Sequence, residues 1–99
     1  MPKEELKLSI LREVETVNTQ RELSEKVGCS VGTVKSILKL LINDGYVSLE
    51  GILINNKLKN KYSLSKKGEN YRYELTEKLL EKKKNELQAL EQEYRNEKR

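Results

Sequence analysis

The sequence predicts a mainly α-helical chain that contains one small β-hairpin and ends in a long C-terminal helix. Three observations lead to this fold class. Apolar residues recur at helical spacing through the first half of the chain. Two short alternating segments then flank an Asn- and Lys-rich stretch at residues 50–60. From residue 73 onward, apolar residues recur every seven positions.

The composition allows one small domain and suits an anionic partner. Charged residues make up 36% of the 99 residues and hydrophobic residues 35%, so a large enzyme-type core is not expected. The net charge is +4, and the basic excess lies within residues 57–99, most densely at 57–61. The absence of His and the single Cys exclude a Cys/His zinc site and an intrachain disulfide. No cofactor is therefore expected.

The chain also lacks the signals of export and of membrane insertion. No signal peptide follows Met1, and no apolar run approaches the length of a membrane span. The lone Cys29 suits a reducing compartment. We therefore expect a cytoplasmic protein without a membrane partner.

A first helix is predicted over residues 3–16, because one face of it is apolar. The residues on that face are Leu6, Ile10, Leu11, Val14 and Val17.

Two further helices follow, separated by a tight turn. Thr19 with Glu22 three residues later is a capping box that begins a short second helix. Gly28 is expected to end this helix in a left-handed conformation. Ser30 caps the third helix, which runs to residue 44. The predicted inward residues of these two helices are Leu23, Val27, Val34, Ile37, Leu38 and Leu41.

The hairpin is predicted to have short strands and a long tip. Residues 46–49 and 61–64 alternate and read as strands, whereas residues 50–60 read as a basic loop between them. Ser65 is expected to cap the last helix, with Gly68 in its first turn.

The last helix is predicted to join two copies of the chain. Its apolar residues follow an imperfect heptad that is weaker than a leucine zipper. A helix of roughly 30 residues spans about 45 Å, so its apolar face would be exposed in a monomer. We expect one domain at residues 1–67 and a dimerisation helix at 68–99, in parallel or antiparallel packing. The candidate dimerisation residues are Leu75, Leu79, Leu80, Leu87, Leu90 and Tyr94.

The order of helix, short helix, tight turn, helix and two strands is the winged helix-turn-helix arrangement. The third helix, residues 30–44, is expected to lie in the major groove, because its outward side chains are small, hydroxyl-bearing or cationic. The basic wing, residues 50–61, is expected on the DNA backbone or in the minor groove. The candidate DNA-binding residues are Thr19, Gln20, Arg21, Ser30, Gly32, Thr33, Lys35, Ser36, Lys39, Asn56, Lys57, Lys59, Asn60 and Lys61.

Two other classes of protein were weighed against a DNA-binding regulator. A winged helix with a coiled-coil arm also serves as a protein–protein interaction module. Catalysis is not expected, because the chain has no His and no nucleophile beside a base. The stretch GCSVGTVK at residues 28–35 is not a P-loop, since it lacks the required Gly-Lys-Ser/Thr ending and follows a helix.

Residues 19–68 resemble a winged-helix domain of the MarR type. The resemblance is carried by TQRELSEKVGCSVGTVKSILKLLINDGYV at 19–47 and by YSLSKKG at 62–68, where Ser65 and Lys66 replace the more usual Thr-Pro. The short length and the Asn/Lys-rich wing resemble a small subgroup of MarR-like regulators associated with exopolysaccharide gene clusters.

The resemblance implies a transcriptional regulator that binds double-stranded DNA as a homodimer. A two-fold dimer would place two third helices about 34 Å apart on a pseudo-palindromic operator. Typical MarR proteins are longer, and several bind small effectors between the DNA-binding lobe and the dimer helices. No effector pocket is carried over to this shorter chain, so no small-molecule effector is expected.

Overall fold

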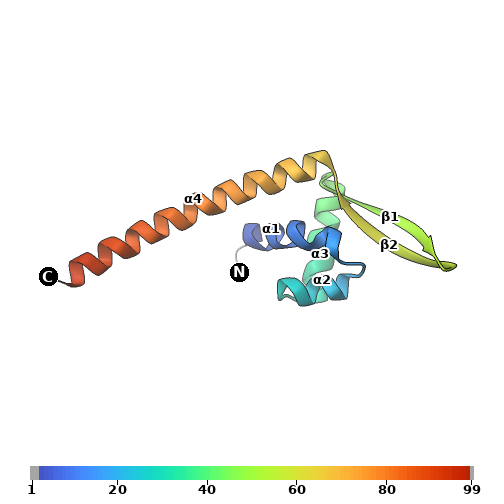
Figure 1. The fold of residues 1–99 in the computed structure, drawn as a ribbon, viewed down its shortest axis with the longest axis horizontal. Coiled ribbons are helices and arrows are strands. Elements are labelled where there is room, and N and C mark those ends of the chain that lie inside the picture. The colour runs from blue at the N-terminus through green and yellow to red at the C-terminus, as the bar shows by residue number, and fades with distance from the viewer. Residues whose placement is uncertain (1–2, 99) are drawn as a thin grey trace.

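The computed structural model describes residues 3–98 and has the predicted order of elements. Three helices form a small body, a β-hairpin projects from one side, and a long helix runs past the body (Figure 1). The elements are α1 (Lys3–Glu13), a 3-10 turn η1 (Val14–Thr16), α2 (Gln20–Val27), α3 (Val31–Asn43), β1 (Val47–Ile54), β2 (Lys57–Leu64) and α4 (Lys66–Glu97). The mainly α-helical fold class with one hairpin is confirmed.

The predicted caps are in place at the starts of three helices. The hydroxyl oxygen of Thr19 accepts a hydrogen bond from the Glu22 amide at 3.1 Å, and that of Ser30 accepts one from the Thr33 amide at 3.1 Å. The Ser65 hydroxyl accepts from the Gly68 amide at 2.9 Å. These bonds satisfy amides that have no partner within their own helix, so each helix begins where the sequence predicts.

One hydrophobic core lies between α1, the α2–α3 pair and the start of α4. Every predicted inward residue of the first three helices is buried, and Gly28 has the expected left-handed conformation, with φ at +75°. Leu8, which the helical pattern did not select, is also buried. The reason is that α1 contacts α2 and α3 on one side and α4 on another, so more than one face of it is covered.

The wing differs from the prediction, because residues 50–60 are not a long loop. The strands are eight residues each and pair in an antiparallel register from Val47 with Leu64 to Ile54 with Lys57. Asn55 and Asn56 form the turn, with φ of 52° and 63°. Two consecutive positive φ values are those of a type I′ turn, which Asn tolerates and which suits the twist of a hairpin. Polar residues of low strand propensity concealed this pairing in the sequence.

The junction between α3 and α4 is tightly packed around Tyr46. The rings of Tyr46 and Tyr71 stack with centroids 4.1 Å apart, and the Lys67 ammonium lies 4.9 Å from the Tyr46 ring centre. Partial burial, and secondarily the neighbouring Tyr46, raise the pKa of Tyr71 above its ordinary value. The same Lys67 ammonium donates to the Asp44 carbonyl at 2.7 Å. These contacts set the direction in which α4 leaves the body.

Replacing Gly68 with Ala is expected to destabilise the fold by roughly 1–3 kcal/mol, the usual cost of overpacking. A Cβ at Gly68 would overlap the carbonyl oxygen of Tyr46, which is backbone and cannot rotate away. The midpoint of urea unfolding measures the effect. Gly32→Ala is the matched control, because its Cβ would meet only the Ser30 hydroxyl, at 4.0 Å. We expect the control to be neutral or slightly stabilising. Equal unfolding midpoints for the two variants would show that the close approach of Gly68 to the Tyr46 carbonyl does not limit the stability of the fold.

The described part of the chain is elongated, because α4 extends well beyond the body. Its extents are 69 × 25 × 20 Å, and its radius of gyration is 17.6 Å, against about 13 Å for a compact chain of this length. Every described residue from 81 to 98 is exposed. The distal part of α4 therefore adds no buried side chain to the core.

Candidate nucleic-acid interface

The outer face of α3 is free of acidic side chains and open to solvent. The predicted outward residues Gly32, Thr33, Lys35, Ser36 and Lys39 are all exposed. The α3 helix, Val31–Asn43, contains no Asp or Glu. Among the described residues, neither lysine of this face takes part in an ion pair. Both ammonium groups are therefore available to an anionic partner.

The hydroxyl groups on this face are engaged with their own helix. Ser36 donates to the carbonyl oxygen of Gly32 at 3.1 Å, and the hydroxyls of Ser30 and Thr33 lie 2.9 Å apart. The capping role of Ser30 therefore occupies part of its hydrogen-bonding capacity. The Ser36 oxygen, which acts as a donor here, keeps its lone pairs for accepting from a base edge.

A groove runs between α3, the start of α2 and the base of the wing. We call it the α3 groove. It is lined mainly by Gln20, Lys35, Lys39, Asn43, Leu49 and Tyr62. The prediction included the first three of these residues and omitted the others. Two of the omitted residues, Leu49 and Tyr62, are paired across the two strands. Had the sequence been read as longer alternating strands, both residues would have been placed on the same face of the wing.

The start of α2 has one exposed cation and one acid. Arg21 is exposed, whereas Gln20 is half-buried in the α3 groove. Thr19, Glu22 and residues 58–60 of β2 line a second groove. The hydroxyl of Thr19 is already used to cap α2, and the nearby Glu22 would repel a phosphate.

The predicted DNA-binding residues of the wing are divided between its two faces and its turn. Lys57, Lys59 and Lys61 alternate along β2 and therefore share one face, with Glu50 paired opposite Lys61. Asn60 lies on the other face. Asn56 lies in the turn. The predicted wing set is thus one lysine face, one turn residue and one residue on the opposite face.

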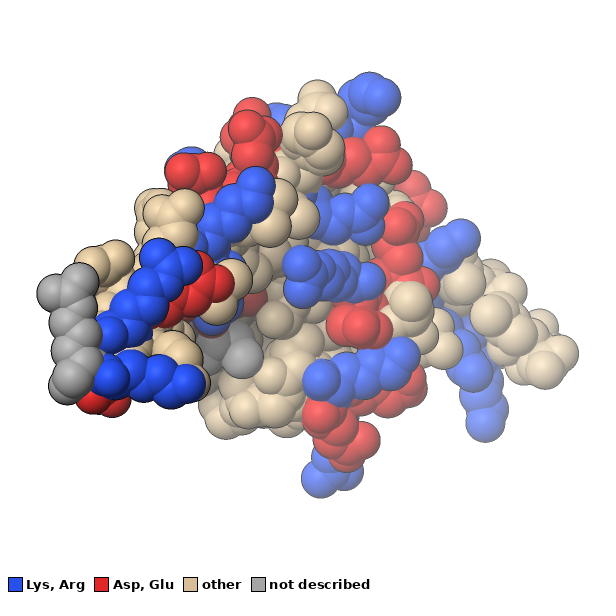
Figure 2. Space-filling view, turned by 60° about the vertical axis from the view of Figure 1, so that its left-hand side comes forward, with Lys and Arg blue, Asp and Glu red and all other residues tan. Residues whose placement is uncertain are grey.

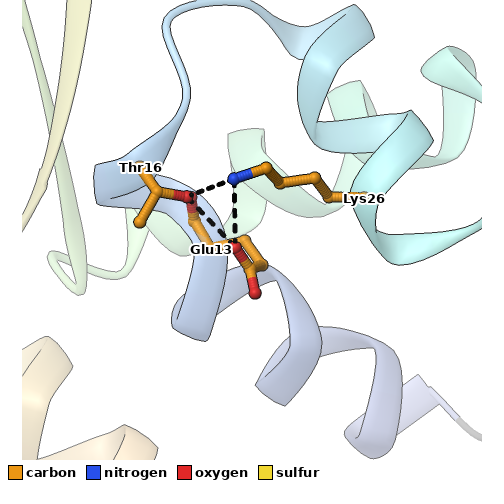
Figure 3. Close-up of polar contacts among 3 residues, drawn as sticks. All are labelled: Glu13, Thr16 and Lys26. Carbon is orange, nitrogen blue, oxygen red and sulfur yellow. Dashed lines mark hydrogen bonds and ion pairs between the residues drawn. The ribbon is translucent and has the colours of Figure 1, made fainter.

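A polar contact joins the end of α1 to the end of α2 (Figure 3). The Lys26 ammonium donates to the Thr16 hydroxyl oxygen at 3.1 Å and lies 3.6 Å from a carboxylate oxygen of Glu13. The Thr16 hydroxyl in turn lies 2.8 Å from the Glu13 carbonyl oxygen. Exposed ion pairs contribute at most about 1 kcal/mol, so this contact adds little to the stability of the fold.

The candidate dimerisation residues fall into two groups. Leu75, expected at the seam between two copies, is instead 3% exposed in the core of a single chain, and Leu79 is half-buried against that core. Both therefore pack against the core of their own chain, and a further role for them in a dimer seam stays a prediction. The remaining four, Leu80, Leu87, Leu90 and Tyr94, are exposed.

The lysine run at residues 82–84 of α4 is partly neutralised within the chain. The ammonium groups of Lys82 and Lys83 each lie 3.9 Å from a carboxylate oxygen of Glu5, and Lys83 also pairs with Glu86 at 3.6 Å. Figure 2 shows basic and acidic side chains intermixed over the face that it displays. This run is therefore unlike the acid-free face of α3.

Other kinds of site find no support within residues 3–98. No group of three metal-ligating side chains occurs there. None of the helices in that range combines the length and the hydropathy needed to cross a bilayer. Cys29 is a free, half-buried thiol in the turn between α2 and α3.

Comparisons with known proteins agree with this geometry. Residues 4–48 match the sequence model of a family described as winged helix-turn-helix DNA-binding. No curated protein sequence matches the chain.

Several solved structures share the fold. The protein smu.1704 from Streptococcus mutans superposes with a TM-score of 0.74 at 23% identity, over 87% of this chain and 86% of that chain. Sso10a-2, a DNA-binding protein from Sulfolobus solfataricus, superposes with a TM-score of 0.70 at 19% identity, over 93% of this chain and 92% of that chain. NMB1585, a MarR family regulator from Neisseria meningitidis, gives 0.58 at 22% identity, over 85% of this chain and 60% of its own. Identities at this level establish the fold.

The body, the wing and the exposed α3 together define a winged helix-turn-helix protein. The winged helix-turn-helix fold that the MarR-type resemblance at residues 19–68 implied is confirmed by the family match and by these structures, one of which is a MarR family regulator. The narrower exopolysaccharide-cluster subgroup stays a prediction.

Proposed function

We propose that this protein is a transcriptional regulator that binds double-stranded DNA as a homodimer. The observation that carries the proposal is the outer face of α3, which is exposed, cationic and without acids, beside a projecting wing. In this arrangement α3 enters the major groove, and the wing follows the backbone or the minor groove.

The chemistry of α3 suits a reading helix. Gly32 and Thr33 are small, so the start of the helix can approach the base edges closely. Lys35 and Lys39 are four residues apart and lie on the same face, where they reach guanine acceptors or phosphates. The Ser36 oxygen between them accepts from a base amino group.

An exposed apolar stripe along α4 supports a homodimer. Tyr73, Leu80, Leu87 and Tyr94 are spaced by seven and are 54–72% exposed in the single chain. A second copy packed along this stripe would remove these side chains from water, which is the main favourable term in helix association. A two-fold pair would present two α3 helices to successive major grooves, about 34 Å apart, on a pseudo-palindromic operator.

A mobility shift with genomic DNA fragments at two salt concentrations tests the proposal. A DNA-binding regulator shifts a subset of fragments, and binding weakens by about 0.9 log units per log unit of salt for each phosphate contacted. A chain that shifts no fragment at low salt, its own promoter included, is not such a regulator. That result would favour the protein–protein interaction module.

Replacing Lys57, Lys59 and Lys61 together with Ala is expected to weaken binding to all DNA fragments alike. The salt slope should fall by about 0.9 for each phosphate that the variant no longer neutralises, because fewer counterions are released on binding. Titrations at several salt concentrations measure that slope. The control replaces Lys78, Lys84 and Arg95 of α4 with Ala, which removes the same charge from exposed residues that form no ion pair within residues 3–98. If the wing variant keeps the wild-type slope, the wing does not contact phosphates.

A further inference from the structure

The wing carries a strip of exposed leucines on one face. Leu53 of β1 pairs directly with Leu58 of β2, and Leu49 lies four pairs nearer the body, on the same face. Leu53 is 74% exposed and Leu58 is 72% exposed. We call these three residues the leucine strip. Side chains of this size gain nothing from the fold at such exposure, so the core does not explain them.

The strip runs from the α3 groove to the tip of the wing, with the pair Gly51–Asn60 between Leu49 and the other two leucines. Leu49 lines the α3 groove together with Lys35 and Lys39. Between Leu49 and the tip lies Gly51, and a Cβ placed there would be 3.1 Å from the Leu58 side chain. Leu58 therefore leans over Gly51 and closes the gap. The surface that would read DNA and the leucine strip are thus one continuous surface.

The opposite face of the same hairpin is cationic. Lys57 and Lys59 lie there, paired across the strands with Ile54 and Ile52. A partner of this wing must therefore offer apolar contact to one face and negative charge close to the other. The minor groove of DNA has both, since deoxyribose walls and base edges lie between two rows of phosphates.

A second copy of the chain fits the leucine strip less well. Stable protein interfaces bury at least about 1,200 Å² in total, far more than a few leucines on a two-stranded hairpin supply. Two wings joined through their leucine strips would leave both lysine faces turned outward, without a negatively charged partner. Charge complementarity therefore favours DNA as the occupant.

We propose that Leu53 and Leu58 form an apolar wedge that enters the minor groove beside the α3 site and partly unstacks a base step. This inference rests on the proposed DNA-binding function. Lys57 and Lys59, on the other face, hold the flanking phosphates. Apolar wedges of this kind bend DNA and bring more of it against the protein. Flexible pyrimidine–purine steps are the steps that open at least cost.

The test replaces Leu53 and Leu58 together with Thr, which removes apolar surface and is itself a β-branched residue that favours strands. The matched control replaces Ile52 and Ile54 with Thr on the lysine face. The probe is a DNA fragment that the wild-type protein shifts, with 2-aminopurine placed at steps flanking the α3 site. Affinity, salt slope and 2-aminopurine fluorescence are measured for all three proteins. Sedimentation gives their oligomeric state, and circular dichroism shows that each is folded.

The wild-type protein is expected to raise 2-aminopurine fluorescence at one flanking step, and the leucine variant to lose that rise. The leucine variant should also bind about tenfold more weakly with an unchanged salt slope, because its phosphate contacts are all retained. The isoleucine control should keep the fluorescence rise.

Three results would overturn the wedge. The first is a leucine variant that binds DNA with wild-type affinity, or whose loss of DNA affinity is no larger than that of the isoleucine control. The second is no fluorescence rise at any flanking step with the wild-type protein. The third is a leucine variant that changes oligomeric state and binds DNA normally. A wild-type protein that shifts no DNA fragment at all would instead overturn the proposed function.

Discussion

Lys35→Ala and Ser36→Ala are each expected to lower affinity for the operator by about 5- to 150-fold and to relax its sequence preference. This range corresponds to the removal of one base contact, about 1–3 kcal/mol. Both side chains are exposed on α3, and Ala favours helices at least as well as the residues it replaces, so the fold should persist. The hydroxyl of Ser36 bonds only to its own helix, at the Gly32 carbonyl, so its removal leaves no buried group unpaired.

Competition titrations with operator and unrelated DNA measure this effect. The difference between the two affinities separates base reading from simple charge attraction. Lys84→Ala is the control for Lys35→Ala, since it removes one exposed lysine from α4. The control should retain the preference for operator. If both α3 variants bind operator as the wild type does, α3 is not the reading helix.

Leu80→Asp combined with Leu87→Asp is expected to produce folded monomers. Both leucines are more than half exposed in the single chain and lie seven residues apart on one side of α4. Burying two unpaired carboxylates against a second helix costs more free energy than the apolar contact between the helices contributes. A monomer would bind only one half-site of the operator. Operator affinity should therefore fall by about two orders of magnitude or more, because the second half-site is no longer bound intramolecularly.

Sedimentation equilibrium reports the mass of this variant. Asn85→Asp with Gln92→Asp is the matched control, since it adds the same two charges on the side of α4 away from the heptad stripe. The control should sediment as the wild type does. A leucine variant that remains dimeric would place the dimer contact elsewhere, and an unchanged operator affinity would mean that dimerisation is not needed for binding.

The local features of this protein were predictable because local chemistry decides them. Thr19, Ser30 and Ser65 begin helices, since their side chains satisfy amides that the helix leaves free. Gly28 ends α2, because the left-handed turn there disfavours a side chain. The helical spacing of apolar residues identified the inward face of each of the first three helices.

The wing and its surface could be predicted only in part. Its existence followed from two alternating segments, but its register depends on which residues pair across the strands. That register places the lysines on one face of the wing and Leu53 and Leu58 on the other. The sequence alone does not show this separation, because these residues lie close together along the chain. The α3 groove likewise joins Gln20, Lys35 and Leu49 from three elements, and only their packing brings them together.

Leu8 and Leu75 show where the sequence alone was insufficient. Periodicity describes one face of one helix, so it marked Leu75 as part of a seam and left Leu8 unassigned. The tertiary structure buries each against the other element, because the junction at Tyr46 and Gly68 directs α4 back over α1. Caps, turns and helix faces thus follow from neighbouring residues. Which faces are covered follows from the direction of α4, which depends on contacts between segments far apart in the chain.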